Sequence, residues 1–538
     1  MPSDHFLCSD RFSSLVGQLM IQHHVPGLSI ATVQDQKIRS VGYGHACLTR
    51  STPCTADTLF DIASSAKSLT AAAVGLLVVD NQSYPEVQWD ATMSSLLPND
   101  FVMSGTGYTE GVTVEDILSH RSGMAAHDSS YMGHRAVRPD NAQSITRNLR
   151  NLPVAAPIRA RYLYCNMMYT VATYLVEVKS TQSFGQFLQH RIFQPLGMQS
   201  TSLQPGSARS KVLGDRIASG YYWQKAESTY YEVQSSDCEE GQGAGSIISS
   251  VGDFIKWIKA LLNRENPISE RLYQGLVRGR SLKNPNARRL KPYSSPAIYA
   301  AGLEVHYYRG CMVVGHDGNI AGFASRFLFL PDFKFGAVIF ANSSNAGPVT
   351  SILAREFMDH ILQVPEIERP RHKFKTTANT PTTAKPLVVA SDFYHSPNHQ
   401  GTETHKNTAK NQSQARKKNK VQQKSDHPGG VVQTQKTPLE AYTGVYSHPG
   451  YHALVVQIKD GNIFIDATDR SMGFTLTFEH VSDQTKYIAH LSDLVEGGDD
   501  PIKAEFILEG AQAVKMGLNL EPALMELIWF EKHEVRRG

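Results

Sequence analysis

Runs of apolar residues with helical or alternating spacing divide the chain into recognisable elements. The spacing in residues 11–24 predicts a helix, and LSIATVQDQKIRSVGYGHA (28–46) predicts two strands that meet at a polar turn at Asp35-Gln36. SLTAAAVGLLVVD (68–80) is apolar on every side and therefore predicts a buried helix. This part of the chain thus predicts a helix, a hairpin and a buried helix in succession.

Helical patterns continue through the middle of the chain. Thr113 and Asp116 have the spacing of a capping box, which predicts a short helix at the start of 112–124. Residues 250–263 predict an amphipathic helix with one apolar face. That face consists of Phe254, Trp257, Ile258 and Leu261.

Strand patterns return in residues 311–342, where a hairpin turn is expected near Pro331-Asp332. A closing helix is expected to begin with Pro348 as its first helical residue and to end near Leu362. Strands therefore come from both ends of this region, with helices between and after them. This order predicts an α+β fold, in which a central antiparallel sheet is flanked by helices.

The last part of the chain has a different pattern, which begins at Leu439. Short alternating runs follow one another there: YHALVVQIKDGNIFID, MGFTLTFEHV, KYIAHL, KAEFILEG and MELIWFEK. Such runs predict a second domain, a small antiparallel β-barrel of about 100 residues.

A basic and polar stretch separates the two patterns. Residues 371–436 contain twelve Lys and Arg against three Asp and Glu, a net charge of +9. Because the whole chain has a net charge of +3, the remaining residues carry a net charge of about −6. The stretch has too few large apolar residues to offset the entropy of ordering, so we expect it to be disordered. The predicted organisation is a catalytic domain (1–370), a disordered basic polar linker (371–437) and a barrel domain (438–538).

Several classes of protein are not favoured by the sequence. The N-terminus lacks a secretory signal pattern, and no run of about 18 apolar residues occurs, so a cytoplasmic protein without a membrane partner is expected. The six cysteines include no C-x-x-C pair, and no H-E-x-x-H occurs, so no metal is expected. Neither a G-x-G-x-x-G motif nor a P-loop occurs, so no nucleotide cofactor is expected. The basic stretch has no interleaved aromatic residues, and we interpret it as a solvated linker that binds no nucleic acid.

The strongest chemical feature is Ser64-Ser65-Ala66-Lys67, the only S-x-x-K in the chain. Residues at i and i+3 share one helix face, so the Ser64 hydroxyl and the Lys67 amine are expected side by side. Free N–H groups at the helix N-terminus favour an oxyanion there. A serine activated by a neighbouring amine is one way to build an acyl-transfer nucleophile. The alternative is a helix-capping serine beside a surface lysine.

Two further motifs complete a constellation. Tyr164-Cys165-Asn166 is the only Y-x-N and precedes an apolar helix pattern, and Gly315-His316-Asp317-Gly318 follows a strand, where we expect a tight turn. A structural tyrosine with a capping asparagine, and plain turn residues such as Asp317, are the alternatives. Cys165 is interpreted as a filler residue. Four other histidines are interpreted as loop or core polar groups: His23, His24, His120 and His127.

In the order S-x-x-K, Y-x-N, H-x-G, these motifs resemble the serine β-lactamase and penicillin-binding-protein superfamily. The resemblance is to its class C-like branch of esterases, D-aminopeptidases and fungal transesterases, and it covers roughly residues 11–363. It is supported by TADTLFDIASSAKSLT, VTVEDILSHRSGM, GAGSIISSVGDFIKW and GHDGNIAGFASRFLFLP. LEAYTGVYSHPGY resembles the opening of the lipocalin-like barrel appended to many members. The resemblance implies a β-lactamase/transpeptidase-like fold for the first domain.

The resemblance also implies roles for individual residues. Ser64 would be the acylated nucleophile, Lys67 would help to deprotonate it, and Tyr164 would be the general base, with its pKa lowered by the adjacent ammonium. Asn166 would orient the substrate. The oxyanion would be held by the backbone N–H groups of Ser64 and Asn319. His316 and Gly318 would line the pocket on the strand edge.

One residue departs from the family pattern, because lysine usually stands in β-lactamases where this chain has His316. Histidine is only partly charged near neutral pH, so an anionic β-lactam is disfavoured as substrate. We therefore expect a cofactor-free serine hydrolase or acyltransferase for a small ester, thioester or amide. The resemblance to fungal transesterases implies a role in secondary metabolism, with an acyl-carrying synthase as partner. Alternatives are a D-amino-acid-specific peptidase or amidase, and a non-catalytic binding protein that retains the fold.

Overall fold

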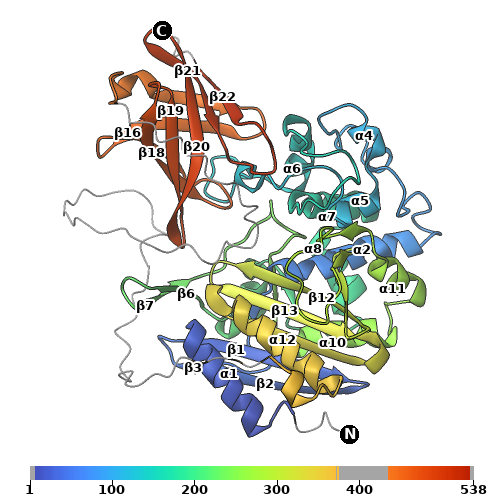
Figure 1. The fold of residues 1–538 in the computed structure, drawn as a ribbon. Coiled ribbons are helices and arrows are strands. Elements are labelled where there is room, and N and C mark those ends of the chain that lie inside the picture. Colours follow the sequence, from blue (N-terminus) through green and yellow to red (C-terminus); the bar gives the residue numbers. More distant parts are fainter. Residues whose placement is uncertain (1–5, 371, 373, 375–433, 534–538) are drawn as a thin grey trace. The chain divides into compact units, whose positions relative to one another are not determined.

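The computed structural model describes residues 6–370, 372, 374 and 434–533, which form two compact units (Figure 1). The first unit runs to Asp128 and resumes at Arg138. The second unit contains residues 129–137 and the C-terminal barrel. The predicted linker, 371–437, lies almost entirely outside the described residues, so its disorder stays a prediction.

The first unit is built on a nine-stranded sheet in which all neighbouring strands are antiparallel. The order across the sheet is β3-β2-β1-β14-β13-β12-β11-β10-β9. The strands in that order are Thr52–Pro53, Lys37–Cys47, Gly27–Gln34, Phe335–Ala341, Phe323–Leu330, Cys311–Ile320, Glu304–Tyr308, Ile298–Tyr299 and Ser281–Leu282. The predicted α+β fold is confirmed, because strands from both ends of the unit meet at β1 and β14.

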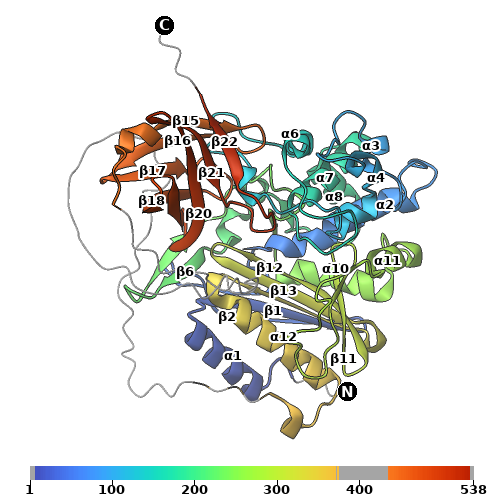
Figure 2. The ribbon, with the colours of Figure 1, turned by 45° about the horizontal axis from the view of Figure 1, so that its top comes forward.

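Helices cover both faces of this sheet (Figure 1 and Figure 2). Helix α1 (Asp10–His23) and helix α12 (Gly347–Ile361) share one apolar core with alternate residues of β1 and β14. Helix α10 (Val251–Asn263) packs against the same strands from the other side, where Phe254 contacts Phe340. Because both faces are covered, β1 and β14 are buried along almost their whole length.

Two further helices of the unit, α2 (Lys67–Val79) and α7 (Met167–Ser180), begin at or directly after predicted site residues. Helix α2 is buried along nearly its entire length, as the apolar run predicts. The apolar face predicted for α10 is confirmed, since Phe254, Trp257, Ile258 and Leu261 are all fully buried. The α-helices not yet given are α3 (Met93–Leu96), α4 (Tyr108–Gly111), α5 (Val114–Leu118), α6 (Ala142–Asn148), α8 (Phe184–Leu188), α9 (Pro205–Ala208) and α11 (Glu270–Val277).

Two small sheets complete the first unit. One has the order β4-β8-β5, and the other pairs β6 with β7. Their strands are β4 (Phe60–Asp61), β8 (Ile247–Ser249), β5 (Ser202–Leu203), β6 (Gly220–Gln224) and β7 (Thr229–Val233). The first sheet matters for the site, because β4 leads directly into the turn that carries Ser64.

The second unit is a closed antiparallel barrel of eight strands, as predicted. Its interior combines aliphatic side chains with a cluster of aromatic ones, among them Tyr442, Tyr446, Phe478 and Phe506. The strands in chain order are β15 (Gly444–His448), β16 (His452–Lys459), β17 (Asn462–Ala467), β18 (Phe474–Ser482), β19 (Lys486–Asp493), β20 (Gly497–Glu509), β21 (Gln512–Leu518) and β22 (Ile528–Lys532).

Residues 129–137 belong to this second unit although they are far from the barrel in sequence. The Gly133 N–H donates to the Asp469 carbonyl over 2.9 Å, and the Ser471 N–H donates to the Tyr131 carbonyl over 3.0 Å. These two backbone bonds form an antiparallel bridge between the segment and a barrel loop. The barrel unit therefore includes a piece of chain from the first third of the sequence.

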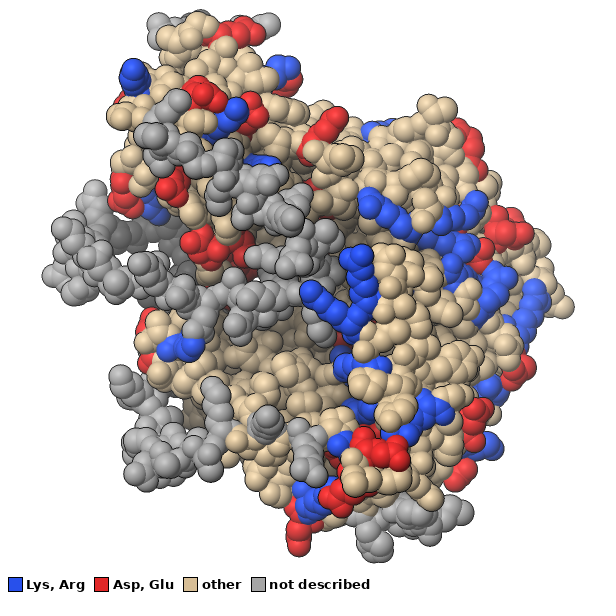
Figure 3. All heavy atoms as spheres, viewed as in Figure 1, with Lys and Arg blue, Asp and Glu red and all other residues tan. Residues whose placement is uncertain are grey.

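Lys and Arg side chains also gather on the folded surface (Figure 3), although the residues outside 371–436 carry a net charge of about −6. Figure 3 shows Lys and Arg side chains concentrated on part of the first unit, with Asp and Glu among them. One ion-pair cluster places several guanidinium groups around two carboxylates, Glu115 and Asp116. Its cations are Arg121, Arg159, Arg278 and Arg280. Among the helices of the described ranges, none is both long and apolar enough to span a membrane.

The packing of the buried face of α10 against the sheet can be tested by mutation. Leu261→Ala removes a fully buried side chain (0% exposed) and should lower the free energy of unfolding by about 2–5 kcal/mol. Ile21→Ala, on a residue that is 72% exposed in α1, is the matched control and should change it by less than about 0.5 kcal/mol. Urea unfolding followed by tryptophan fluorescence measures both. Equal effects of the two substitutions would contradict the packing described.

Candidate active site

A tight turn between β4 and α2 presents Ser64. Ala63 adopts a left-handed backbone (φ 45°), and its N–H donates to Asp61 Oδ1 over 2.9 Å. The hydroxyl of Ser325 donates to the Ile62 carbonyl over 2.6 Å. These bonds fix both sides of the turn, so that Ser64 stands in a single 3-10 turn (Ala63–Ala66) at the N-terminal end of α2.

Lys67 lies at the first turn of α2 and is fully buried, with 0% of its surface exposed. Its ammonium reaches three oxygen acceptors: Ser64 Oγ at 3.0 Å, Asn166 Oδ1 at 2.8 Å and the Ala244 carbonyl at 2.7 Å. Burial lowers the pKa of Lys67 to about 7, while the nearby Asp128 carboxylate opposes that shift. The lysine can therefore change its charge near neutral pH. The predicted side-by-side placement of Ser64 and Lys67 is what the structure shows.

Tyr164 lies on the other side of the serine, and its phenol donates to Ser64 Oγ over 2.9 Å. Lys67 Nζ is 4.9 Å from the centre of the Tyr164 ring. The expectation that the lysine lowers the pKa of Tyr164 is wrong, because desolvation raises that pKa well above its ordinary value. Tyr164 is thus a neutral phenol at neutral pH, and it points a proton at the serine oxygen.

Asn166 precedes α7 and links two charged groups. Its Oδ1 accepts from Lys67, and its Nδ2 donates to Asp128 Oδ1 over 3.2 Å. Asp128 was not predicted as a site residue, because it belongs to no motif and stands far from Lys67 and Asn166 in sequence. Its role is visible only once the chain has folded. The carboxylate holds the asparagine amide and favours the charged form of Lys67.

The expected tight turn at Gly315–Gly318 is wrong, because these residues continue strand β12, which turns only after Ile320. Asp317 is accordingly a strand residue and forms an ion pair with Arg326 of β13 at 2.9 Å. Gly318 is required by a close approach, not by a turn. A Cβ atom at Gly318 would lie 2.4 Å from the Ile62 carbonyl oxygen and 2.8 Å from the Ser64 nitrogen.

His316 faces the interior and is 4% exposed. Its Nδ1 lies 2.6 Å from the Asp317 carbonyl, so this nitrogen carries the proton and donates. Nε2 then accepts from the Tyr299 hydroxyl at 2.8 Å. Burial lowers the pKa of His316, which keeps it neutral. Both nitrogens are occupied by protein groups, and the imidazole offers no cation.

One edge of β12 is open beside the serine. Strand β11 pairs with β12 only as far as Gly315, opposite Glu304, whereas β13 pairs with it up to Ile320. The backbone beyond Gly315 therefore has β13 on one side and no strand on the other among the described residues. Asn319 lies in this stretch with its side chain exposed. Its backbone N–H stays the predicted second oxyanion donor.

His120 is a site residue that sequence reasoning placed among loop or core groups. Its ring centre lies 4.2 Å from that of Tyr164 and 4.6 Å from that of Tyr299. Tyr162 and Tyr169 complete an aromatic cluster around it. The single signal in the sequence was its place in LSHRSG, next to the capping-box helix α5. That position does not reveal which residues it contacts.

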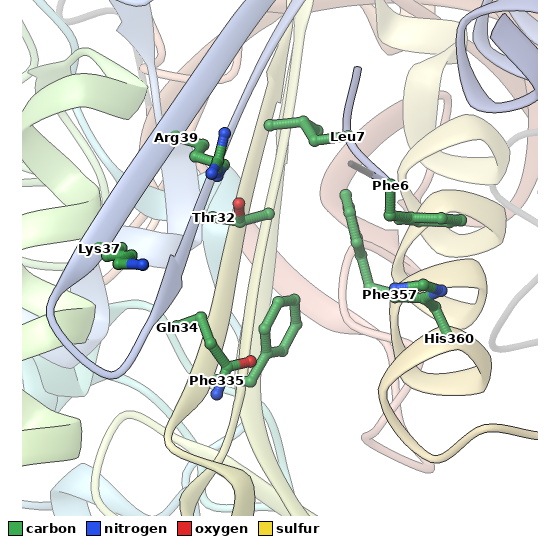
Figure 4. A pocket seen from close by; sticks show the side chains of 9 residues that line it. All are labelled: Phe6, Leu7, Thr32, Gln34, Lys37, Arg39, Phe335, Phe357 and His360. Carbon is green, nitrogen blue, oxygen red and sulfur yellow. The ribbon is translucent and has the colours of Figure 1, made fainter. Parts of the chain in front are cut away.

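No metal site accompanies these groups, since no cluster of three or more His, Cys, Asp or Glu suited to an ion occurs within 6–370, 372, 374 and 434–533. None of the six cysteines, all of which lie in the described part of the chain, forms a disulfide bond. A separate cavity of about 20 Å³ is lined by the residues that Figure 4 labels, from β1, β2, β14, α12 and the N-terminal segment. It has room for about one water molecule and none for an ester or amide substrate.

Comparison with protein families gives two matches. The model described as Beta-lactamase matches residues 12–356, which include every residue of the constellation around Ser64. A domain of unknown function (DUF3471) matches residues 430–532, the barrel. The first match covers more than half of the chain.

Two curated relatives align along nearly the whole chain. "Unguisins hydrolase ungD" of Aspergillus violaceofuscus is 34% identical over 93% of this chain and 86% of its own length. "Unguisins hydrolase ungD'" of Aspergillus campestris is 32% identical over 97% of this chain and 91% of its own length. Both alignments therefore extend over the candidate site region and into the barrel region.

Solved structures show the same fold at lower identity. The octameric penicillin-binding protein homologue from Pyrococcus abyssi has a TM-score of 0.56 and 20% identity, covering 97% of this chain and 99% of its own. The D-amino acid amidase from Ochrobactrum anthropi SV3 has a TM-score of 0.52 and 22% identity, covering 66% of this chain and 98% of its own. At these identities the likeness concerns the fold alone.

The close approach of β12 to the serine can be tested with Gly318→Ala. The added methyl group forces the strand away from the Ser64 turn, so labelling of Ser64 by a fluorophosphonate should slow about 100-fold. Gly17→Ala, on a helical glycine with no neighbour within 4 Å of the added atom, should leave the rate unchanged. Wild-type labelling of the Gly318 variant would show that the strand does not constrain the site.

Proposed function

Because the chain belongs to the beta-lactamase family, we propose that it is a serine hydrolase that cleaves an ester or amide through an acyl-enzyme. One observation carries the proposal. Ser64 Oγ lies 3.0 Å from the Lys67 amine and 2.9 Å from the Tyr164 hydroxyl, which supplies a nucleophile with a base and an acid in direct contact. Both relatives that align along the chain are named hydrolases.

Lys67 is the base in this mechanism. Its pKa of about 7 leaves a large neutral fraction at physiological pH, and the amine lone pair then faces the Ser64 hydroxyl. Ser64 gives its proton to Lys67 as its oxygen attacks the substrate carbonyl carbon. The oxyanion that forms lies at the N-terminal end of α2, where the Ser64 N–H and the open edge of β12 can donate.

Tyr164 is the acid. When the tetrahedral intermediate collapses, the bond from the carbonyl carbon to the leaving group breaks, and the leaving group takes the phenol proton. The tyrosinate is then neutralised by the proton that Lys67 holds, which returns both groups to their first state. Water then attacks the acyl-enzyme and gives a proton to Lys67. The bond between the acyl carbon and Ser64 Oγ breaks, Ser64 takes the phenol proton of Tyr164, and the carboxylic acid product leaves.

The charges around β12 favour a neutral acyl group. His316 is neutral and fully engaged, Arg326 is paired with Asp317, and the Lys283 ammonium is paired with the Glu304 carboxylate. A substrate carboxylate at this strand would meet no unpaired cation among these three groups, and it would lie near two carboxylates. Esters and amides without a nearby carboxylate fit better. The names of the two Aspergillus relatives make unguisins the first candidates to assay.

Covalent labelling tests the nucleophile. Wild-type protein should gain one adduct mass with a fluorophosphonate and hydrolyse p-nitrophenyl esters with a burst, because Ser64 contacts both its base and its acid. Ser64→Ala should lose the adduct and the turnover. Ser95→Ala, at an exposed serine, should retain both. A wild-type protein without adduct or burst would refute the hydrolase, and a labelled Ser64→Ala protein would refute the choice of nucleophile.

The pH dependence tests Lys67 as the base. Its pKa in the folded protein is lowered to about 7, so the neutral form predominates above that pH and the protonated, inactive form below it. The rate of Ser64 labelling should rise with pH and level off above about 7, with a roughly tenfold loss per unit on the acid side. Tyr164→Phe should retain this limb at a lower rate. A pH-independent rate from about pH 5 to 9 would exclude Lys67 as the base.

A further inference from the structure

His120 binds both backbone N–H groups that flank Tyr164. Its carbonyl accepts from the Leu163 N–H over 2.8 Å, and its Nδ1 accepts from the Cys165 N–H over 3.1 Å. One residue thus fixes the peptide on either side of the tyrosine. The three bonded residues come from segments more than forty positions apart, so this clamp is a tertiary contact and not a local turn.

The His120 ring also restricts the Tyr164 side chain. The two ring centres are 4.2 Å apart with 36° between the planes, which is a tilted stacking contact. With the flanking peptides held and one ring face covered, the phenol is left pointing at Ser64 Oγ, 2.9 Å away. The orientation of the proposed acid is therefore set largely by one histidine.

Packing alone does not account for histidine at this position. His120 is 1% exposed, and its Nε2 has no hydrogen-bond partner among the described residues. An unpaired buried N–H costs free energy that an apolar ring would not. The backbone of His120 is left-handed (φ 58°), a conformation that histidine adopts more readily than most side chains. The gain that offsets the cost of the unpaired N–H is the acceptor that Nδ1 offers to Cys165.

We propose that His120 is a positioning residue that holds Tyr164 in line with Ser64, an inference that rests on the proposed function. It acts through the Leu163 and Cys165 amides and through ring contact, without touching the reacting atoms. Only the tautomer with its proton on Nε2 can do this, because Nδ1 must keep its lone pair for the Cys165 N–H.

The surroundings of His120 preserve that tautomer. Burial lowers its pKa well below the ordinary value, and nearby cations act in the same direction. A proton added to Nδ1 would replace the acceptor with a donor and break the bond to Cys165. The titratable groups that face His120 from the elements around it are Lys67 (α2), Tyr162, Tyr164 and Cys165 (before α7), Tyr169 (α7), Lys283 (after β9), Tyr299 (β10) and His316 (β12).

Two substitutions separate the acceptor from the ring. His120→Phe keeps an aromatic ring but removes the acceptor. His120→Asn removes the ring but places an amide oxygen near the position of Nδ1, and asparagine tolerates the left-handed backbone. His190→Phe, at an exposed histidine outside the site, is the matched control. The assays are steady-state hydrolysis of a p-nitrophenyl ester and hydrogen–deuterium exchange of the peptide that contains Cys165.

The expected results differ between the variants. His120→Phe should lower kcat about 10–100-fold with KM nearly unchanged, since the acid is displaced while the binding groups stay. The Cys165 peptide should exchange faster in this variant. His120→Asn should recover most of kcat and of the exchange protection, and His190→Phe should match wild type in both. A purely structural histidine would instead show losses that follow melting temperature, with no rescue by asparagine.

Failure of this inference is distinguishable from failure of the proposed function. If His120→Phe retains wild-type kcat and wild-type exchange at Cys165, His120 does not position Tyr164, and the hydrolase proposal stands. If wild type shows no turnover that depends on Ser64, the hydrolase proposal fails. If the phenylalanine variant does not fold, the asparagine variant decides: a protein of wild-type melting temperature that keeps kcat but loses Cys165 protection, or keeps that protection but loses kcat, would overturn the acceptor role.

Discussion

The first unit is organised around one costly group, the buried amine of Lys67. A lysine shielded from solvent needs an acceptor for each of its N–H bonds. The acceptors come from three segments that are far from one another in sequence, at Ser64, Asn166 and Ala244. The start of α2, the start of α7 and the loop before β8 must therefore meet at one point. The arrangement that lowers the cost of burial is the same one that brings the lysine to the serine, so stability and chemistry are tied together here.

The sheet takes part in this arrangement through Gly318. Strand β12 can run against the turn at Ser64 because nothing projects from Gly318 toward the Ile62 carbonyl and the Ser64 nitrogen. The early end of β11 at Glu304 then leaves the adjoining edge uncovered by a strand of the described chain. The N–H groups proposed to hold the oxyanion belong to the backbone of this strand and this turn, so their positions do not depend on flexible side chains.

Local features could be predicted from spacing in the sequence, whereas long-range contacts either followed from the family resemblance, as for Ser64 and Tyr164, or could not be predicted. The spacing of Ser64 and Lys67 predicts their contact, because three residues of helix fix it. The apolar face of α10 and the barrel strands are periodic and were predicted in the same way. Gly318 was assigned to a turn, since glycine in a sequence indicates freedom in the backbone and does not show that another chain segment passes close by. Asp128 and His120 act across more than thirty residues, for which no spacing rule exists.

The bridge between residues 129–137 and the barrel loop changes how the two matched regions can be regarded. They look like separable modules, one ending near 356 and the other starting near 430. Yet the backbone of the barrel loop at Asp469 and Ser471 is hydrogen-bonded to residues 131 and 133, which lie within the first matched region. A single cut therefore cannot release either part intact. A barrel expressed without this loop would leave the Asp469 carbonyl and the Ser471 N–H without the backbone partners that Gly133 and Tyr131 supply.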